Sequence, residues 1–469
     1  MSVVILPAFG YNNSGLKIYI LEGCQSMGNN NEKKSRDQFR TRMGFIVACI
    51  GSAVGMGNIW MFPYRTGAFG GAAFLIPYFI FVLVLGFSGV LGEIAFGRVM
   101  GTGPTGAFGQ AMAMRGKRGG RLIGLIPVIG SLGIAIGYSV VVGWFLKYLF
   151  AAVSGSLSQV EDMGAYFASI SGSFGSVGWH MLGLAVTFLI MLFGIADGIE
   201  RMNKIMMPLF FVFFLILLVR VASLPGAMEG YRYLFIPRWE LLGNMKTWVY
   251  ALGQAFFSLS LAGSGTIVYG SYLKNDVDVV NCARNVAFFD TCAALLAGMV
   301  VIPAVFAFGL DVAAGPPLMF ITLPAVFNQM PMGRLFALIF FIAVLFAAIT
   351  SLMNLFETPI EALQEQFKLS RGMAVACVAA CAALVGIFIE SADAVSVWMD
   401  AVSIYMIPLG ALLAAVMFFW VCPKGFAREQ VQKGRSKKLG SWFEPVTKYL
   451  FVGLTLVVYV LGILFGGIG

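Results

Sequence analysis

The chain has 469 residues, of which 59% are hydrophobic and only 11% are charged. So little charge over this length excludes a soluble globular protein and predicts a polytopic membrane protein. The formal net charge of +9 does not indicate nucleic-acid binding, because the basic residues gather in alternate loops between apolar segments. The seven cysteines are scattered, mostly inside those segments, and lack the spacing of metal ligands.

Residues 1–35 are predicted to form a cytoplasmic tail. The first 26 do not fit a signal peptide, since no basic residue precedes the short apolar run Val3-Val4-Ile5-Leu6. Met27 opens a polar, basic stretch that is typical of a cytoplasmic start. We therefore expect residues 1–26 to be disordered or to lie upstream of the true start of translation.

Eleven apolar segments are long enough to cross a membrane as helices. They are residues 44–66, 71–97, 122–152, 180–196, 203–224, 247–271, 283–310, 333–366, 372–390, 394–422 and 445–467. Lys and Arg concentrate before the first segment and after each even-numbered one. The positive-inside rule makes that side cytoplasmic. This predicts an integral protein of the plasma (inner) membrane with its N-terminus inside and, after eleven spans, its C-terminus outside.

The first apolar segment is interrupted near its middle by Gly51-Ser52-Ala53-Val54-Gly55-Met56-Gly57-Asn58. Three glycines and an asparagine are poor helix formers, and freed backbone groups find no water in hydrocarbon. Such a break indicates a cavity or a bound ion and polar solute. The alternative is a helix–helix contact, because Gly51 and Gly55 also form a small-xxx-small packing pattern.

The sixth segment carries a similar interruption between Gly253 and Gly265, where small and hydroxyl residues replace apolar ones. The first and sixth segments are five spans apart, so they cross the membrane in opposite directions. Their paired breaks predict two inverted five-helix repeats around a site at mid-membrane. The alternative is two unrelated flexible helices. The predicted division is residues 36–224 for the first repeat, 225–422 for the second, and 423–469 for a basic cytoplasmic loop with helix 11.

The motif G-S-A-V-G-M-G-N-I-W-x-F-P-Y (Gly51–Tyr64), followed by G-G-A-A-F-L-I-P-Y (Gly70–Tyr78), closely resembles helices 1 and 2 of the neurotransmitter:sodium symporter family. The resemblance covers roughly residues 36–466. It continues through PAVFAFG (Pro303–Gly309), FITLPAVF (Phe320–Phe327), ITSLMNLFETPIEAL (Ile349–Leu363) and SIYMIPLGAL (Ser403–Leu412). It implies an all-α, leucine-transporter-like fold with eleven transmembrane helices, of which helices 1 and 6 are broken, as in the bacterial amino acid transporter branch.

Asp290 lies in the apolar seventh segment, where an unpaired acid is costly and is a functional hypothesis by default. A bound cation is its natural partner. The resemblance implies a first sodium site formed by Ala53, Asn58, Ser258 and Asp290. It implies a second site formed by Gly51, Val54, Ala347, Thr350 and Ser351. From the residues alone, the hydroxyls of Thr350 and Ser351 could equally bond back to the preceding helical turn.

Many relatives have Asn at the position of Asp290, and animal relatives bind chloride nearby through Tyr, Gln and hydroxyl residues. Tyr78, Gln254 and Ser258 match that set, but its last hydroxyl position is Ala294. Asp290 would supply the negative charge internally. We therefore expect two sodium ions and no chloride.

The resemblance also implies a substrate site between the two breaks. Gly55 stands where amine-transporting relatives have Asp, which indicates a free amino acid rather than a biogenic amine. Tyr138 would donate a hydrogen bond to the substrate carboxylate. Gly263 replaces a bulky aromatic of some relatives and indicates room for a large aliphatic or aromatic side chain. The expected substrate-binding residues are Ser52, Ala53, Gly55, Gly57, Ile134, Tyr138, Phe257, Ser258, Ser260, Gly263, Ser351 and Leu355.

Arg36 and Glu365 match an intracellular gating pair of the family. On the outer side Asp400 matches, but Met61 replaces its usual Arg partner, and Arg65 lies one turn later. Tyr138 and Phe257 would then carry more of the outer gate.

These observations predict a sodium-coupled symporter that imports a neutral amino acid by alternating access. The alternatives are proton coupling through Asp290 and a sodium symporter of another small solute. An intramembrane enzyme that uses Asp290 and Glu93 is disfavoured, because no second acid adjoins Asp290 in the sequence. A channel is disfavoured because paired breaks predict an occluded site. No catalytic residues, nucleic acid or obligatory protein partner are expected; the partners are an amino acid substrate and membrane lipid.

Overall fold

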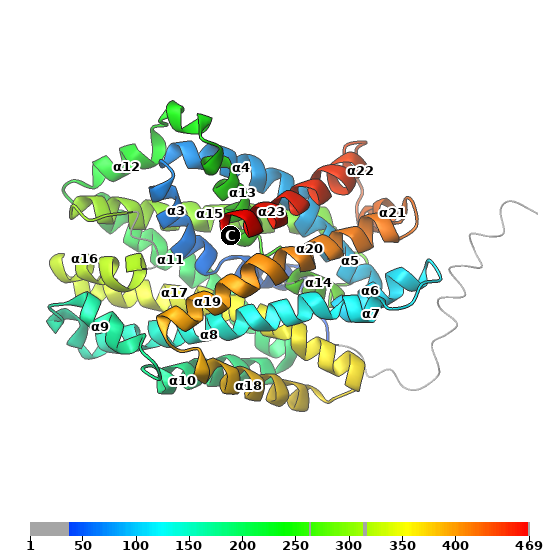
Figure 1. The fold of residues 1–469 in the computed structure, drawn as a ribbon, viewed down its shortest axis with the longest axis horizontal. Coiled ribbons are helices and arrows are strands. Elements are labelled where there is room, and N and C mark those ends of the chain that lie inside the picture. Colours follow the sequence, from blue (N-terminus) through cyan, green and yellow to red (C-terminus); the bar gives the residue numbers. More distant parts are fainter. Residues whose placement is uncertain (1–36, 262–263, 313–316, 468–469) are drawn as a thin grey trace, which may run out of the picture. The chain divides into compact units, whose positions relative to one another are not determined.

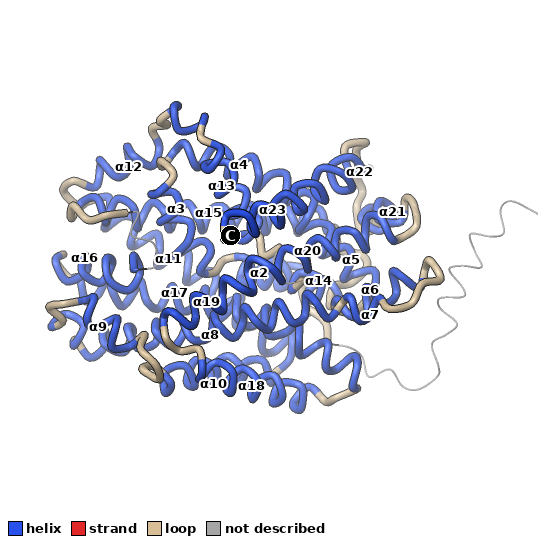
Figure 2. The backbone as a smooth tube through the Cα atoms, viewed as in Figure 1, coloured by secondary structure: helices blue, strands red, loops and turns tan. Residues whose placement is uncertain are grey.

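The computed structural model describes residues 37–261, 264–312 and 317–467. These residues are helical apart from short connections, and no strand occurs among them (Figure 2). The predicted tail of residues 1–35, with its first 26 residues, lies outside the described residues. The rest of the chain, from Gln38 onward, forms one compact unit.

The first predicted span is a broken helix, as its glycines indicated. α2 (Arg42–Ala53) and the helix formed by η1 (Gly57–Met61) and α3 (Phe62–Ala68) meet at an angle of 50°. Val54 leaves helical geometry with φ −71° and ψ 103°, and Gly55 and Met56 complete the break. At the start of α2, the hydroxyl of Thr41 accepts a hydrogen bond from the Gly44 amide, which is an N-cap.

The sixth predicted span is also interrupted. α13 (Met245–Ser258) and α14 (Gly265–Ser271) are separated by a connection in which residues 262–263 are not described. Ser260 (φ +52°) and Ser264 (φ +57°) lie in the left-handed region, which is uncommon for residues other than glycine. Such strain persists only where the surrounding structure holds it, and it is concentrated at functional sites.

The other helices of the first half follow the predicted spans closely. They are α4 (Ala72–Leu85), η2 (Gly86–Val90), α5 (Leu91–Met100), α6 (Pro104–Ala113), α7 (Gly120–Ile123), α8 (Leu125–Ser154), η3 (Ser156–Gln159), α9 (Met163–Ile170), α10 (Val177–Leu192), η4 (Ile195–Glu200), α11 (Arg201–Ala222), α12 (Ala227–Phe235) and η5 (Trp239–Gly243). One boundary differs from the prediction, because Gly194, at φ +82°, ends the fourth span early. Residues 195–200 instead belong to the fifth.

The second half continues with α15 (Val279–Ala307), η6 (Leu318–Thr322), α16 (Leu323–Gln329), α17 (Gly333–Phe367), α18 (Arg371–Phe388), α19 (Ala392–Ala401), η7 (Val402–Met406), α20 (Ile407–Val416), η8 (Met417–Val421), α21 (Phe426–Gln432), α22 (Phe443–Pro445), η9 (Val446–Phe451) and α23 (Val452–Phe465). Every predicted span coincides with one helix or with a run of consecutive helical segments. By length and apolar composition, eight helices of the described residues can cross a membrane, or nine with the bent α2–α3 pair. The count of eleven therefore stays a prediction.

The long helices α8 and α17 pack along each other, and α10 and α18 lie together beside them (Figure 1). The broken first span is enclosed by α11, α13, α14, α15 and α17. At the close contact of α5 with α14, a Cβ on Gly97 would lie only 1.9 Å from the Ile267 carbonyl oxygen, so only glycine fits there. Both helix breaks are thus held inside the bundle, where their backbone polar groups need partners from the protein or from a ligand.

Candidate functional site

Side chains from three different helices meet at the first break around Asp290. The Asn58 amide nitrogen donates to Asp290 Oδ1 at 2.7 Å and to the Asp290 carbonyl oxygen at 3.0 Å. The Ser258 hydroxyl donates to Asp290 Oδ2 at 2.8 Å and lies 3.0 Å from the Asn58 nitrogen. All three residues are at most 1% exposed. Within the described residues, Asp290 forms no ion pair with Lys or Arg.

Polar neighbours extend this cluster on both sides. The Tyr78 hydroxyl lies 3.4 Å from the Ser258 hydroxyl, and the Gln254 amide donates to the Gly57 carbonyl oxygen at 2.8 Å. Asn58 Oδ1 accepts from the Gly55 amide at 3.1 Å. The structure therefore brings together Asn58, Ser258 and Asp290 of the predicted first sodium site, and Ala53 lies in the adjoining pocket.

The predicted second sodium site lies where α2 ends beside α17. The Thr350 hydroxyl donates to the carbonyl oxygens of Phe346 and Ala347, at 3.0 Å each. The Ser351 hydroxyl lies 3.3 Å from the Ser52 carbonyl oxygen, and a Cβ on Gly51 would lie 3.0 Å from Thr350 Cβ. The Thr350 hydroxyl thus bonds to the preceding helical turn, which was the alternative to a sodium site for this residue. The other predicted members are close at hand, and Val54 follows directly at the break.

Asn203, on α11, was not predicted as a site residue. Its side chain is fully buried, and its nitrogen donates to the Ile199 carbonyl oxygen at 2.8 Å. Its Oδ1 points at Gly51, where a Cβ would lie 1.9 Å away, and it has no hydrogen-bond partner among the described residues. Ser52 Oγ and Gln254 Oε1 are likewise buried without a hydrogen-bond partner among the described residues. Buried oxygens without donors are rare in proteins and suit a cation. The sequence signal for Asn203 was a polar residue opening an apolar span.

The predicted substrate residues form one small pocket of about 40 Å³ between the two breaks. Its lining is Ala53, Gly55, Met56, Gly57, Ile134, Tyr138, Phe257, Ser260, Ser351 and Leu355. Ser52 and Ser258 adjoin it through hydrogen bonds: the Ser260 hydroxyl donates to the Ser52 carbonyl oxygen at 2.8 Å, and Ser258 belongs to the Asp290 cluster. Gly263 lies outside the described residues. Met56 was missed, although it is flanked by two of the predicted glycines.

Tyr138 reaches the first break directly, because its hydroxyl accepts a hydrogen bond from the Met56 amide at 2.9 Å. A Cβ on Gly55 would lie 2.9 Å from that hydroxyl and 3.0 Å from Ser351 Oγ. Any side chain at Gly55 would therefore crowd both groups.

A larger cavity of about 240 Å³ adjoins the pocket and shares Met56, Tyr138 and Phe257 with it. Tyr138 and Phe257 thus stand between the two spaces. Asp400 and Met61 line this larger cavity. Arg65 donates to the Tyr64 hydroxyl at 3.3 Å and lies over the Tyr250 ring at 5.3 Å. A gate formed by Arg65 and Asp400 stays a prediction.

At the opposite end of the bundle, Glu365 accepts hydrogen bonds from Thr102 at 2.7 Å and from Thr105 at 3.0 Å. Its predicted partner, Arg36, lies outside the described residues. A second polar cluster there was not predicted. In this cluster Arg371 binds both carboxylate oxygens of Glu357 at 2.9 Å, and Tyr272, the residue after α14, donates to Glu357 at 2.8 Å.

Two further buried polar groups, Glu93 of the disfavoured enzyme hypothesis and His180, make contacts outside this cluster. Glu93 accepts from the Thr266 hydroxyl. His180, fully buried, lies 2.9 Å from the Ser139 hydroxyl and 3.1 Å from a Glu390 oxygen. Among the described residues, no group of three or more His, Cys, Asp or Glu residues is placed to hold a metal ion.

Comparison with known proteins identifies the family. The model of the sodium:neurotransmitter symporter family matches residues 36–168 and 158–464. The chain belongs to that family. It is a multi-pass integral membrane protein and a sodium-dependent symporter, and not an enzyme.

Three relatives place the chain within the sodium:neurotransmitter symporters. An uncharacterized sodium-dependent transporter of Bacillus subtilis, YhdH, is 38% identical over 68% of this chain and 71% of its own length. An uncharacterized sodium-dependent transporter of Haemophilus influenzae is 33% identical over 73% of this chain and 77% of its own length. The crystal structure of MhsT in complex with L-phenylalanine matches with a TM-score of 0.81 and 33% identity, over 91% of this chain and 99% of that one. The predicted all-α, leucine-transporter-like fold is thereby confirmed.

Proposed function

We propose that this symporter carries two sodium ions with one neutral, large aliphatic or aromatic amino acid, without chloride. The observation that supports this most strongly is the Asp290 cluster, which joins a buried carboxylate from α15 to Asn58 at the first break and Ser258 at the second. A buried charge of this kind is stable only when it is paired. A cation that Asp290, Asn58, Ser258 and the backbone of Ala53 hold would compensate it.

The second ion would be held by oxygens from three helices. Gly51 of α2 and Val54 directly after it would contribute backbone oxygens, and Ala347, Thr350 and Ser351 would contribute theirs from α17. Sodium requires several hard oxygen donors, and Asn203 Oδ1 is a further donor of this kind beside Gly51. We include it in the proposed set.

The substrate carboxylate would lie at the start of η1, where Gly57 begins the resumed helix. A helix start presents amides and a positive dipole to an anion. The Tyr138 hydroxyl, which accepts from the Met56 amide, carries a proton that it would donate to that carboxylate. MhsT was solved with L-phenylalanine bound, which supports an amino acid as the substrate class here. Gly55 excludes the Asp side chain that an amine would need.

The pocket of about 40 Å³ is smaller than the roughly 300–1,000 Å³ of typical ligand sites. A large amino acid would therefore require Phe257, which lines the pocket, to move away from it. Such movement matches a gate formed by Tyr138 and Phe257, with Arg36 and Glu365 closing the other end. Basic loops on one side support an N-terminus inside and a C-terminus outside.

Chloride independence follows from the charge of Asp290 and from Ala294, which offers no hydroxyl at the last position of the chloride set. Uptake that collapses when gluconate replaces chloride would refute it. Two sodium ions would also provide enough free energy to accumulate the substrate. Each ion that enters the cell releases roughly 2.3 kcal/mol per 100 mV of membrane potential and about 1.4 kcal/mol per tenfold concentration gradient. Together they would supply about 7 kcal/mol, or roughly 10⁵-fold accumulation of a zwitterion.

The test is the thermal stability of the purified protein with each of the twenty amino acids, in sodium and in potassium. A ligand at one hundred times its dissociation constant stabilises by about 2.7 kcal/mol. We expect stabilisation by large neutral amino acids in sodium only. Stabilisation that ignores sodium but follows pH would instead establish Asp290 as a proton site. The absence of stabilisation in both salts would point to another small solute.

A further inference from the structure

The only histidine of the chain, His180 of α10, lies in a buried polar cluster outside the transport site. Its Nε2 lies 2.9 Å from the Ser139 hydroxyl of α8, and its Nδ1 lies 3.1 Å from Oε1 of Glu390, in the connection between α18 and α19. The ring fits closely, since a Cβ on Gly386 of α18 would lie 2.3 Å from His180 Cε1. Ionisable side chains buried in a membrane bundle are costly, and they indicate a function by default.

The hydrogen bonds determine how many protons this cluster holds. The Ser139 oxygen lies 2.7 Å from the Ile136 carbonyl oxygen, and a carbonyl cannot donate, so the hydroxyl proton is directed there. His180 Nε2 must then donate to the Ser139 oxygen. A neutral imidazole carries one N–H only, so the contact between Nδ1 and Glu390 needs a second proton, on the ring or on the carboxyl group. The His180–Glu390 pair therefore binds one proton and is electrically neutral.

Hydrogen bonds connect this pair to one wall of the larger cavity beside the substrate pocket. Glu390 Oε2 accepts from the Ser176 amide at 3.2 Å and from the Ser176 hydroxyl at 3.3 Å, and Trp144 Nε1 donates to that hydroxyl at 3.1 Å. The Ala392 amide, two residues after Glu390, donates to the Ser171 carbonyl oxygen at 2.9 Å. Trp144 and Ala392 both line the larger cavity.

No other charge compensates the pair within the described ranges, where neither His180 nor Glu390 bonds to a further titratable group. The titratable groups on the helices packed around the pair are bonded elsewhere or reach the surface. They include Tyr138, Lys147 and Tyr148 of α8, Glu200 of η4, Glu357 of α17, Cys381 of α18 and Asp393 of α19. Loss of the shared proton would therefore leave one uncompensated negative charge in a buried interface, which is strongly destabilising.

The order Ser139, His180, Glu390 resembles a hydrolase triad, but the cluster cannot act as one. The Ser139 proton is directed to a backbone carbonyl and not to His180. All three side chains are at most 1% exposed, so no substrate reaches the hydroxyl.

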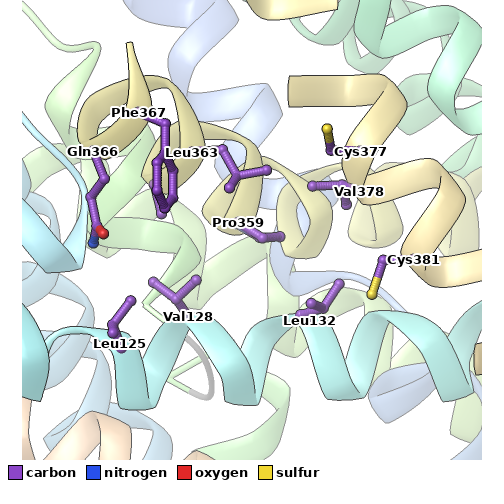
Figure 3. Close-up of a pocket in the computed structure, with 11 residues that line it drawn as sticks. Leu125, Val128, Leu132, Pro359, Leu363, Gln366, Phe367, Cys377, Val378 and Cys381 are labelled. Atoms are coloured by element: carbon purple, nitrogen blue, oxygen red, sulfur yellow. The ribbon is translucent and has the colours of Figure 1, made fainter. Parts of the chain in front are cut away.

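We propose that His180 and Glu390 form a proton-binding site that, with its proton bound, keeps α19 in place as a wall of the larger cavity. After release of the proton to water, the carboxylate charge can be hydrated only when the α18–α19 connection moves away from α10. α18 has room for this movement, because further along it an apolar cavity of about 330 Å³ lies between it and α8, with Cys381 and Leu132 on its two sides (Figure 3). Higher pH should therefore loosen this wall. The proposal depends neither on the transported solute nor on a proton at Asp290.

The first test observes the proton directly. Because the chain has one histidine, ring-¹⁵N-histidine labelling gives nitrogen resonances from His180 alone when the purification tag contains no histidine. The protein in nanodiscs is titrated from pH 5 to pH 10. We expect the Nδ1 resonance to move in one step, and E390Q to remove this step or shift it by at least one pH unit. A wild-type ring without a step, or a step that E390Q leaves in place, would overturn the proposal.

The second test measures the movement of α19. Val395 of α19 is buried and lines the larger cavity, so alkylation of V395C by N-ethylmaleimide, followed by peptide mass spectrometry, reports opening of that wall. The rate is divided by that of V395C with E390Q at the same pH, which removes the effect of pH on the thiol itself. One proton changes an equilibrium by up to about tenfold per pH unit, and we expect this ratio to rise at least about fivefold from pH 6.5 to pH 8.5.

Two further variants, each combined with V395C, separate the proton site from a merely structural contact. H180Q leaves Glu390 without its partner and should give fast alkylation at both pH values. D393N, at an exposed acid three residues after Glu390, should keep the pH dependence of the wild type. Sodium-dependent stabilisation shows that each variant is folded. A ratio that stays constant with pH would overturn the proposal, and so would a pH dependence that D393N removes.

Discussion

Replacement of Asp290 by Asn tests the charge at the centre of the proposed first sodium site. The side chain is fully buried and accepts hydrogen bonds from Asn58 at 2.7 Å and from Ser258 at 2.8 Å. Asn keeps the shape but has a single acceptor oxygen and no charge. The hydrogen bonds from Asn58 and Ser258 then no longer go to a charged group, and a cation meets an amide instead of a carboxylate.

The size and sign of the effect follow from these contacts. A hydrogen bond to a charged group contributes about 1.5–3 kcal/mol. Because 1.4 kcal/mol corresponds to a factor of ten, sodium affinity should fall about ten- to hundredfold. Without sodium the opposite holds, since Asn removes an uncompensated buried charge, which is costly. D290N should therefore melt at a higher temperature than the wild type in potassium, yet gain less from added sodium.

The assay is a sodium titration of the melting temperature at constant ionic strength, followed by uptake into proteoliposomes. D393N, the same change at an exposed acid of α19, is the matched control and should titrate like the wild type. A sodium affinity of D290N within twofold of the wild type would contradict the proposed ligand. Loss of pH-driven uptake with unchanged sodium dependence would establish proton coupling instead.

Three further changes probe the rest of the site. Y138F removes the acceptor of the Met56 amide and the proposed carboxylate donor, so amino acid affinity should fall about tenfold at a cost of about 1.5 kcal/mol; unchanged binding in isothermal titration would exclude that role. G55A places a methyl group 2.9 Å from the Tyr138 hydroxyl and should abolish amino acid binding while sodium still stabilises the protein, and normal uptake would contradict the predicted close approach. N203A should lower sodium affinity about threefold to tenfold. N285A, which removes a similar hydrogen bond to the preceding turn in α15, should not lower it. Equal effects of the two changes on sodium-dependent melting would show that Asn203 has only a structural role.

Much of the architecture is determined by local sequence. Apolar length marks the spans, and glycine at positions 51, 55 and 57 destabilises a helix wherever it lies, so the first break can be predicted without any contact. An acid in an apolar span is unusual on its own account, which is why Asp290 could be singled out. The resemblance then assigned partners to it, and Asn58 and Ser258 do lie against it.

Only the tertiary structure decides which polar groups find partners across the bundle. Asn203 is an ordinary polar residue at the start of a span until Gly51 is found facing its oxygen. Likewise, Pro359 predicts that the Leu355 carbonyl oxygen lacks its helical donor. Only the packing of α8 on α17 shows that the Ser131 hydroxyl donates to that oxygen instead. Helix breakers act within a few residues, whereas these contacts join positions that the sequence places far apart. Their geometry is set by how the helices pack, and no local pattern encodes it.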